Sequence, residues 1–331
     1  MKVLCVLNPL SGGGSAMSRW PQMLEIFRAF DIEPELLSRS DVPIDIQVRE
    51  RLARGGVSEF KAIAGIGGDG TQSAVINGMM EYRNAHPDAV LPPLGFIPMG
   101  TGNDIAKSFG LILRDEFFAS DLRRAVSTLV HGADYHLDLG LFDGRYFADA
   151  LTVGVDSRTL RRRNHRKKYI LRVPCLRWLA RGPVLYVVSW LGLFNFWRKP
   201  SLHVEIRVDG CTWYSGPMLN VVVNNTRIYA GEFDFCTGGY GNDGKLDVVL
   251  FTGHFDYLSR YLLSLRHHPR AIRNMATKLG KAASHVQGKH IVLLLSRPEP
   301  AQVDGEEMPS GERFDIEVVP QAIHIKTPAE P

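Results

Sequence analysis

The first 130 residues alternate between short apolar runs and longer stretches in which apolar residues recur at helical spacing. The apolar runs predict strands at residues 2–7, 35–38, 59–64 and 94–98. The amphipathic stretches predict helices at residues 16–30, 44–54, 72–80, 105–109 and 121–131. Strands that alternate with helices in this way are typical of a doubly wound α/β domain with a parallel sheet.

After residue 134 the pattern changes to many short strands separated by turn residues. Asp143-Gly144 and Asp209-Gly210 each predict the turn of a hairpin. Further strands are predicted at residues 218–223, 246–251, 291–296, 313–318 and 322–325. A basic helix that includes Arg260 is predicted at residues 257–279; we expect it to be a solvated surface helix, with contact to an anionic membrane as the alternative. We therefore expect two domains: an α/β domain over residues 1–133 and an antiparallel β-sandwich over residues 134–331.

Composition narrows the class of protein. The chain has 331 residues and a net charge of +4, which is too small by itself to indicate a nucleic-acid partner. Its four cysteines are too far apart in sequence to form a metal knuckle or a redox pair. No stretch reaches the ~18 uninterrupted apolar residues of a membrane span, and the first residues contain no signal-peptide core. We expect a cytoplasmic protein with reduced thiols.

The candidate chemistry begins at residues 65–71, Gly-Ile-Gly-Gly-Asp-Gly-Thr, which lie between a predicted strand and a predicted helix. Such a turn directs backbone N–H groups and the positive end of a helix dipole at one point, and this favours a phosphate. Asp69 adds a carboxylate, which suits a divalent cation beside that phosphate. The alternative is an ordinary strand-to-helix turn.

Two further glycine-rich loops follow predicted strands, at residues 8–15 and 99–104. Neither is a Walker loop, because no Gly-Lys-Ser/Thr follows the glycines. Parallel strands present their carboxyl ends at one sheet edge, so the loops are expected to be walls of one phosphate site.

Together these three blocks, Asn-Pro-Leu-Ser-Gly-Gly, Gly-Gly-Asp-Gly-Thr and Pro-Met-Gly-Thr-Gly-Asn-Asp, resemble the lipid kinases of the diacylglycerol kinase and sphingosine kinase superfamily. The third block is closest to the diacylglycerol kinase form. The resemblance implies a C-terminal β-sandwich whose final strand can return to the first domain. It also implies that ATP is held by Asn8, Pro9, Ser11, Gly12, Ser38, Gly67, Gly68, Gly70, Thr71, Thr101, Asn103 and Glu306.

The resemblance also gives a role to Val303-Asp304-Gly305-Glu306. On pattern alone this segment is a hairpin turn. In the family, an Asp-Gly-Glu near the C-terminus supplies the aspartate that takes the proton from the acceptor hydroxyl. Asp304 is then the general base, and Asp69 orients Mg²⁺ at the transferring phosphoryl group. Since the two residues are far apart in sequence, a cleft between the two domains is expected.

A possible second metal site lies at Asp243. The resemblance implies that Asp243 holds a structural Mg²⁺ together with the carbonyl groups of Tyr240 and Lys245. Just upstream, Cys236-Thr237-Gly238-Gly239 departs from the family pattern. The alternative is an Asp-Gly turn that leads into a strand.

Basic charge is concentrated in one part of the chain. No acidic residue lies between Asp156 and Glu205, and basic residues there flank the apolar, aromatic-rich residues 184–197. This composition is typical of an interfacial helix on anionic headgroups. A core helix with a solvated basic flank is the alternative, and RNA binding is weaker because basic and aromatic residues are not interleaved.

The sequence therefore predicts an ATP- and Mg²⁺-dependent lipid kinase at the cytosolic face of an anionic membrane, acting alone or as a homodimer. Diacylglycerol is the expected acceptor, and a ceramide or sphingoid base is the alternative. An NAD kinase-like enzyme and a non-catalytic lipid- or nucleotide-binding regulator are the rivals from other classes.

Overall fold

The computed structural model describes residues 1–170, 201–235, 241–265, 267, 272 and 285–328. The chain divides into two compact units. Unit 1 comprises Met1–Leu139, Arg145–Ala148 and Val319–Pro331, and unit 2 comprises Gly140–Gly144 and Asp149–Val318.

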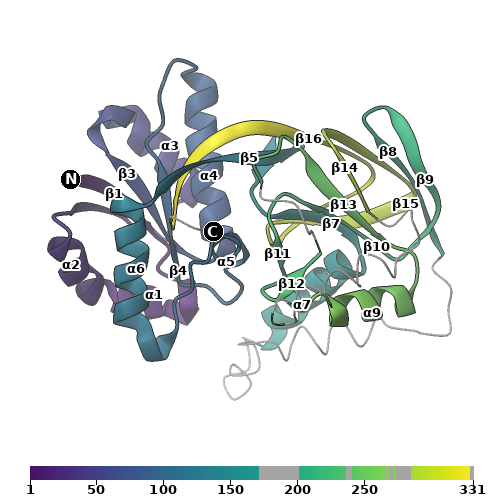
Figure 1. The fold of residues 1–331 in the computed structure, drawn as a ribbon, viewed down its shortest axis with the longest axis horizontal. Helices are drawn as coiled ribbons and strands as arrows, with labels where there is room; N and C mark the ends of the chain where they lie inside the picture. Colours follow the sequence, from purple (N-terminus) through teal and green to yellow (C-terminus); the bar gives the residue numbers. More distant parts are fainter. Residues whose placement is uncertain (171–200, 236–240, 266, 268–271, 273–284, 329–331) are drawn as a thin grey trace. The chain divides into compact units, whose positions relative to one another are not determined.

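Unit 1 contains a parallel sheet with the strand order β2-β1-β3-β4 (Figure 1). Its strands are β1 (Lys2–Leu7), β2 (Glu33–Leu37), β3 (Ala62–Gly67) and β4 (Leu94–Pro98). Its helices are α1 (Ser15–Ser18), α2 (Trp20–Ala29), α3 (Ile44–Gly55), α4 (Asp69–Ala85), α5 (Asp104–Ser108) and α6 (Phe118–His131), with short 3-10 helices η1 (Ser11–Gly14), η2 (Val57–Glu59) and η3 (Asp115–Phe117).

The sheet of unit 1 is apolar on both faces because helices cover both. Val3, Cys5 and Leu7 of β1 belong to a core cluster with residues of α2 and α6. Leu4 and Val6 point to the other face, where α3 packs against α4 and α4 lies over β3. A strand buried on both faces reads as a continuous apolar run, so β1 could be predicted from sequence. The predicted doubly wound fold is confirmed.

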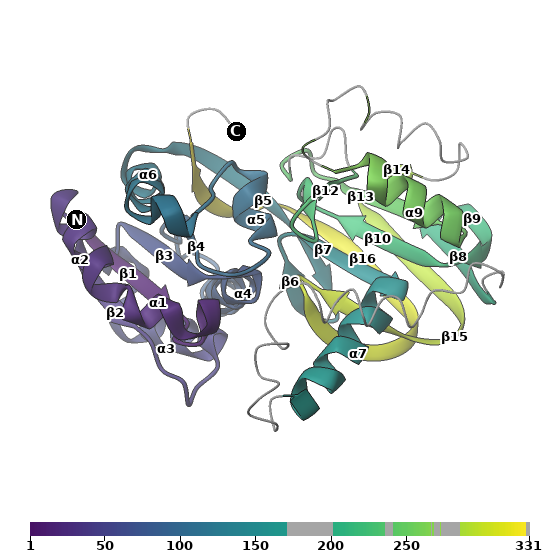
Figure 2. The same ribbon diagram turned by 90° about the horizontal axis from the view of Figure 1, so that it is seen from below.

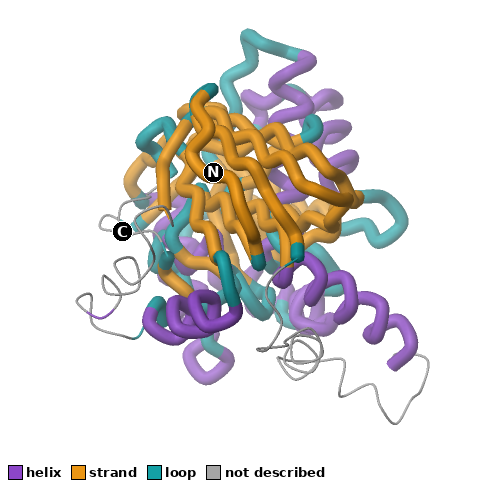
Figure 3. Tube along the Cα trace, turned by 90° about the vertical axis from the view of Figure 1, so that its right-hand side faces the viewer, coloured by secondary structure: helices purple, strands orange, loops and turns teal. Residues whose placement is uncertain are grey.

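Unit 2 is built mainly of antiparallel strands (Figures 2 and 3). Strand β6 (Arg145–Phe147) and most of β5 (Ala133–Phe142) belong to unit 1. The remaining strands are β7 (Ala150–Gly154), β8 (Leu202–Val208), β9 (Cys211–Met218), β10 (Asn220–Asn224), β11 (Ile228–Tyr229), β12 (Phe233–Asp234), β13 (Leu246–Phe251), β14 (His285–Gly288), β15 (His290–Val303) and β16 (Glu306–Thr327). The remaining described helices are α7 (Val155–Ile170) and α9 (His254–Leu263).

Strand β15 belongs to two groups of strands in unit 2. Its first half pairs with β8, and its last residues, Ala301–Val303, pair with β7. Helices α7 and α9 lie on the same side of β7, β10 and β13 (Figure 1). There, Val155 of α7 and the tyrosines of α9 share a core cluster with Val222 and Val249.

Strand β16 runs through both units. Its residues up to Val318 belong to unit 2 and those from Val319 belong to unit 1, where Ile325 pairs in parallel with Leu94 of β4. The strands predicted at residues 313–318 and 322–325 are therefore parts of one longer strand.

Other differences from the predicted elements have local causes. The helix expected at residues 16–30 is interrupted at Arg19, because Pro21 lies in the first turn of α2 and has no N–H to continue α1. The strand expected at residues 59–64 is Ala62–Gly67, so its last glycines belong to the strand. A Cβ on Gly65 would lie 2.0 Å from Oε1 of Gln72, whose Nε2 donates to the Gly65 carbonyl at 2.9 Å, so a side chain at this position would displace the Gln72 amide.

The helix expected at residues 257–279 begins earlier, at His254, and its expected end lies outside the described residues. Helix α9 ends at Leu263, and residues 266, 268–271 and 273–284 lie outside the described residues. Arg260 was expected on a solvated face but is buried, and its guanidinium donates to the carbonyl of Leu250 at 2.7 Å. The apolar stretch at residues 184–197 also lies outside the described part. No helix in the described ranges is long and apolar enough to cross a membrane.

Candidate active site

Three loops leave the carboxyl ends of β1, β3 and β4, which are neighbouring parallel strands, so the loops meet at one sheet edge. The N–H of Asn8 donates to the carbonyl of Ile66 at 3.2 Å, and that of Met99 donates to Gly67 at 2.9 Å. These bonds place the first and third loops on either side of the second.

Side chains from the first two loops meet at Thr71, in the first turn of α4. The Asn8 amide donates to the Thr71 hydroxyl at 3.2 Å, and the Ser11 hydroxyl lies 3.4 Å from it. A Cβ on Gly67 would lie 2.3 Å from the same hydroxyl oxygen, so Thr71 fits only against glycine. The structure therefore brings together Asn8, Ser11, Gly67 and Thr71, as the sequence predicted.

The second and third loops touch through their backbones. A Cβ on Gly100 would lie 2.3 Å from the Cα of Gly68, which no side chain could tolerate without moving the loops apart. Asn103 braces the third loop: its Oδ1 accepts from the Gly100 N–H and its Nδ2 donates to the Gly100 carbonyl, each at 2.8 Å. Asn103 itself has a φ of +55°, a conformation that asparagine adopts more readily than most residues.

Asp69 is half-buried in the first turn of α4. Its Oδ1 accepts from the N–H of Ile105 at 3.2 Å, in the first turn of α5. Burial raises the pKa of Asp69, and hydrogen bonds from the backbone N–H groups of Ile105, Asn103 and Asp104 oppose that rise. These N–H groups favour the ionised carboxylate, which a metal ligand requires.

A second carboxylate, not singled out from the sequence, lies beside Asp69. A Cβ on Gly102 would lie 2.8 Å from Oδ2 of Asp69 and 3.2 Å from Oδ1 of Asp104, so both carboxylates flank this glycine. Asp104 is buried, whereas a surface position is usual for aspartate. One or two carboxylates completed by phosphate oxygens and water are the usual ligands of Mg²⁺, so this pair fits that ion.

The other residues predicted to hold ATP differ in how exposed they are. Thr101 and Gly12 are exposed, and Pro9, Gly70 and Glu306 are half-buried. Ser38 directly follows β2, at the same sheet edge, and its covered hydroxyl has no hydrogen-bond partner among the described residues. A covered hydroxyl of this kind is suited to a ligand that supplies the missing partner.

Asp304 is buried in the turn of the β15–β16 hairpin, in unit 2. Asp304 and Gly305 have φ values of +46° and +77°, as in a type I′ turn. Oδ1 of Asp304 accepts from the N–H groups of Asp149 at 2.9 Å and Ala150 at 3.2 Å. Two N–H donors stabilise the ionised carboxylate, which is the form that can accept a proton.

Asp149 was not predicted from the sequence. It is buried between β6 and β7, and its Oδ1 accepts from the Thr226 hydroxyl at 2.7 Å. The sequence signal was an acidic residue within an apolar run, Phe-Ala-Asp-Ala-Leu, and such a residue must be buried with partners if the run is buried.

The segment predicted to hold a structural metal ion provides few ligands among the described residues. Asp243 is exposed, its Oδ1 accepts from the N–H of Lys245 at 3.1 Å, and its Oδ2 accepts from Gln287 at 3.3 Å. Tyr240 lies outside the described residues. In the described ranges no group of three or more His, Cys, Asp or Glu side chains could hold a metal ion. The Asp243 site stays a prediction.

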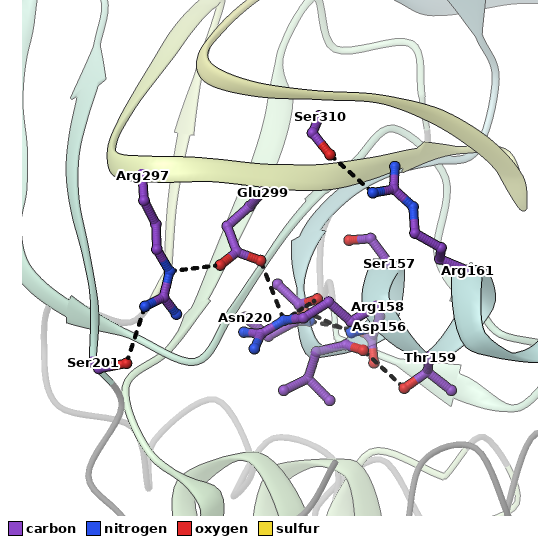
Figure 4. A network of polar contacts seen from close by, with 12 residues as sticks. Asp156, Ser157, Arg158, Thr159, Arg161, Ser201, Asn220, Arg297, Glu299 and Ser310 are labelled. Carbon is purple, nitrogen blue, oxygen red and sulfur yellow. Dashed lines mark hydrogen bonds and ion pairs between the residues drawn. The ribbon is translucent and has the colours of Figure 1, made fainter. Parts of the chain in front are cut away.

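A polar network in unit 2 surrounds Asp156, in the first turn of α7. The hydroxyls of Tyr229, Tyr257 and Tyr261 and the amide of Asn220 all donate to its carboxylate. Burial raises the pKa of Asp156, and the tyrosine hydroxyls oppose that rise. Figure 4 shows Asp156 with Asn220 and with the arginines of the same helix.

Comparison with known proteins agrees with the family resemblance of the sequence. Residues 2–141 match the family described as "Diacylglycerol kinase catalytic domain". A "Probable lipid kinase YegS-like" from Citrobacter koseri is 26% identical over 301 residues, 88% of this chain and 89% of that protein. A "Probable lipid kinase YegS" from Salmonella arizonae is 26% identical over 330 residues, 95% of this chain and 98% of that protein.

Among solved structures, a "putative diacylglycerol kinase" from Bacillus anthracis str. Sterne superposes with a TM-score of 0.66 at 19% identity, covering 98% of this chain and 97% of that chain. This likeness concerns the fold.

Proposed function

Because the chain belongs to the superfamily of diacylglycerol kinases and related lipid kinases, we propose that it transfers the γ-phosphoryl group of ATP to a lipid hydroxyl. The proposed acceptor is diacylglycerol and the product is phosphatidic acid. The observation that supports this most directly is the close backbone contact of Gly68 and Gly100 beside Asp69.

In this proposal the three loops of unit 1 hold the nucleotide. The first-turn N–H groups of α4 point out of the helix at this edge and would bind phosphate oxygens. Asn8 and Ser11 hold Thr71 in place, and Ser38 offers its hydroxyl to the nucleotide. Glycine at Gly67 and Gly68 lets a phosphate approach the backbone.

Asp69 and Asp104 would hold Mg²⁺, which when bound neutralises charge on the transferring phosphoryl group. The backbone N–H groups around Asp69 favour its ionised form and so oppose the rise in pKa that burial causes. Gly102 leaves open the space between the two carboxylates.

Asp304 would act on the acceptor. An alcohol is a weak nucleophile, and Asp304 accepts its proton as the oxygen attacks the phosphoryl group. The two N–H groups that hold Oδ1 fix the carboxylate in place.

We propose that the lipid is met at an anionic membrane surface. Helix α7 carries seven basic residues, of which Arg158 and Arg161 pair with carboxylates of unit 2. Its one acidic residue is Asp156, which the tyrosines bind. Basic residues near an anionic surface contribute about 1 kcal/mol each. Cosedimentation of the protein with lipid vesicles should therefore require phosphatidylglycerol, and the bound fraction should decrease as the salt concentration is raised.

The proposal is tested with radiolabelled ATP and vesicles of phosphatidylcholine and phosphatidylglycerol that contain diacylglycerol, ceramide or a sphingoid base. Label in phosphatidic acid is expected. Label in a different lipid would change the acceptor but keep the reaction class, and transfer to NAD in solution would favour the rival class. No labelled product from any acceptor would refute a kinase function.

A further inference from the structure

The turn that carries Asp304 ends a hairpin whose pairing is irregular. Next to the turn, Val303 pairs with Glu306 and Ala301 with Met308. The register shifts between Pro300 and Ala301, and again between Leu294 and Glu299. An irregular stretch therefore separates the tip of the hairpin, residues 299–311, from the regular pairing further along, and other contacts must help to fix the tip.

Helix α7 supplies such contacts on the β16 side through one guanidinium group. Arg161 donates from Nε to Glu307 at 2.7 Å, from Nη1 to the Ser310 hydroxyl at 2.9 Å and from Nη2 to the Met308 carbonyl at 3.2 Å. The bond to Ser310 is drawn in Figure 4. A planar guanidinium with three bonds to one strand fixes both the distance and the angle between helix and strand.

The same helix also contacts β15. Arg158 lies 3.3 Å from the carboxylate of Glu299, which is 5% exposed and also accepts from Arg297 (Figure 4). The network around Asp156 reaches β15 as well, because Gln302 donates to the hydroxyl of Tyr229 at 3.0 Å. Helix α7 therefore holds both strands of the hairpin close to its turn.

We propose that Arg161 is a positioning residue for Asp304, acting through the β15–β16 hairpin. This inference rests on the proposed function, in which Asp304 accepts the proton of the lipid hydroxyl. Proton transfer needs donor and acceptor within hydrogen-bond reach, and a displacement of about 1 Å can cost up to 100-fold in rate. Loss of the Arg161 contacts removes three bonds from the β16 side of the tip and leaves the longer bond from Asn164 to Glu307 at 3.4 Å. The rate should therefore fall although Arg161 touches no substrate.

The test is Arg161→Met, which keeps the aliphatic stem and removes the three bonds. We expect kcat to fall about 10- to 100-fold with diacylglycerol in phosphatidylcholine–phosphatidylglycerol vesicles, and KM for ATP to change less than about twofold. The matched control is Arg207→Met. Arg207 and Glu205 form an equally short surface pair at 2.7 Å, with similar exposure, on the β8–β9 hairpin. This control should keep wild-type kcat.

A conservative variant separates an effect of Arg161 on the position of Asp304 from an effect on the stability of the protein. Arg161→Lys keeps the charge but can make only some of the bonds, so its kcat should lie between those of wild type and Arg161→Met. Glu307→Gln removes one acceptor charge from an exposed site and should lower kcat less than Arg161→Met. If Arg161→Met does not fold, Arg161→Lys and Glu307→Gln decide the question, and wild-type kcat in both would overturn the inference.

Other outcomes would also overturn it. A folded Arg161→Met with wild-type kcat, or a loss of kcat equal to that of Arg207→Met, shows that Arg161 does not position Asp304. Asp304→Asn is assayed in parallel. If Asp304→Asn is inactive and Arg161→Met is fully active, only the positioning inference fails; if Asp304→Asn is fully active, the role of Asp304 in the proposed function fails.

Discussion

Replacement of Asp304 should affect stability and catalysis to different extents, depending on the residue introduced. Its carboxylate accepts from the N–H groups of Asp149 and Ala150, and all three residues are buried. In Asp304→Ala both N–H groups lose their acceptor. In Asp304→Asn an amide oxygen of the same shape can still accept both bonds, while the proton-accepting carboxylate is gone.

The contacts give the size of the difference. Hydrogen bonds to charged groups contribute about 1.5–3 kcal/mol each, so the alanine variant loses about 3–6 kcal/mol. Alanine at a φ of +46° costs about 1 kcal/mol more. The asparagine variant keeps both bonds at roughly half strength and tolerates this φ, so we expect it to lose about 1–3 kcal/mol. Against a typical total of about 5–15 kcal/mol, only the alanine variant approaches unfolding.

Urea unfolding of both variants measures this difference, and phosphoryl transfer by the folded asparagine variant measures the chemistry. We expect kcat of Asp304→Asn to fall about 10²- to 10⁴-fold, as for a lost general base, with little change in KM for ATP. An alanine variant as stable as the asparagine variant would refute the hydrogen-bond argument. A near-normal kcat for Asp304→Asn would refute the assignment of the base.

Three further predictions concern unit 1. Asp69→Asn should keep its bond to the Ile105 N–H but lose Mg²⁺-dependent ATP binding, measured by titration with and without Mg²⁺; unchanged binding would argue against a metal role. Gly100→Ala should raise KM for ATP and destabilise the protein by about 1–3 kcal/mol, because its Cβ meets the Gly68 backbone; a normal KM would contradict this. The hydrogen bond from Arg51 lowers the pKa of Glu35 from 4.5 to about 2. The ionised Glu35 therefore stabilises the folded protein fully above pH 4.5, and this contribution is lost as pH falls toward 2. Thermal unfolding of Glu35→Gln should therefore depend less on pH across that range than wild type does, and an equal dependence would contradict the pairing.

Much of the fold of unit 1 could be predicted because the sequence patterns that mark its strands and helices are local. Buried parallel strands read as apolar runs, and glycine blocks mark their ends. The helix predicted at residues 44–54 is observed at Ile44–Gly55 and ends at Gly56, which has a φ of +77°. The contact of Gly68 with Gly100 could not be predicted in detail, because it depends on how two loops 30 residues apart pack together.

In unit 2 the hairpins with Asp-Gly turns were predicted, and all three such turns have positive φ at both residues. Strand β7 was missed because it has only five residues and is followed at once by α7, without a turn signal between them. Asp104 and Asp149 were missed for a different reason: each is buried beside a carboxylate distant in sequence, Asp69 or Asp304, and a single sequence does not show such burial.

The course of β16 has a consequence for how the protein is made. Within its residues 319–327, Ile325 pairs in parallel with Leu94 of β4, so the N-terminal half of a nascent chain lacks this neighbour of β4 until residues beyond 319 have left the ribosome. A chain that stops at residue 318 would leave β4 without that neighbour and expose its edge to pairing with other molecules. Truncation at the C-terminus should then cause aggregation through the sheet of unit 1, whose other strands lie far away along the polypeptide.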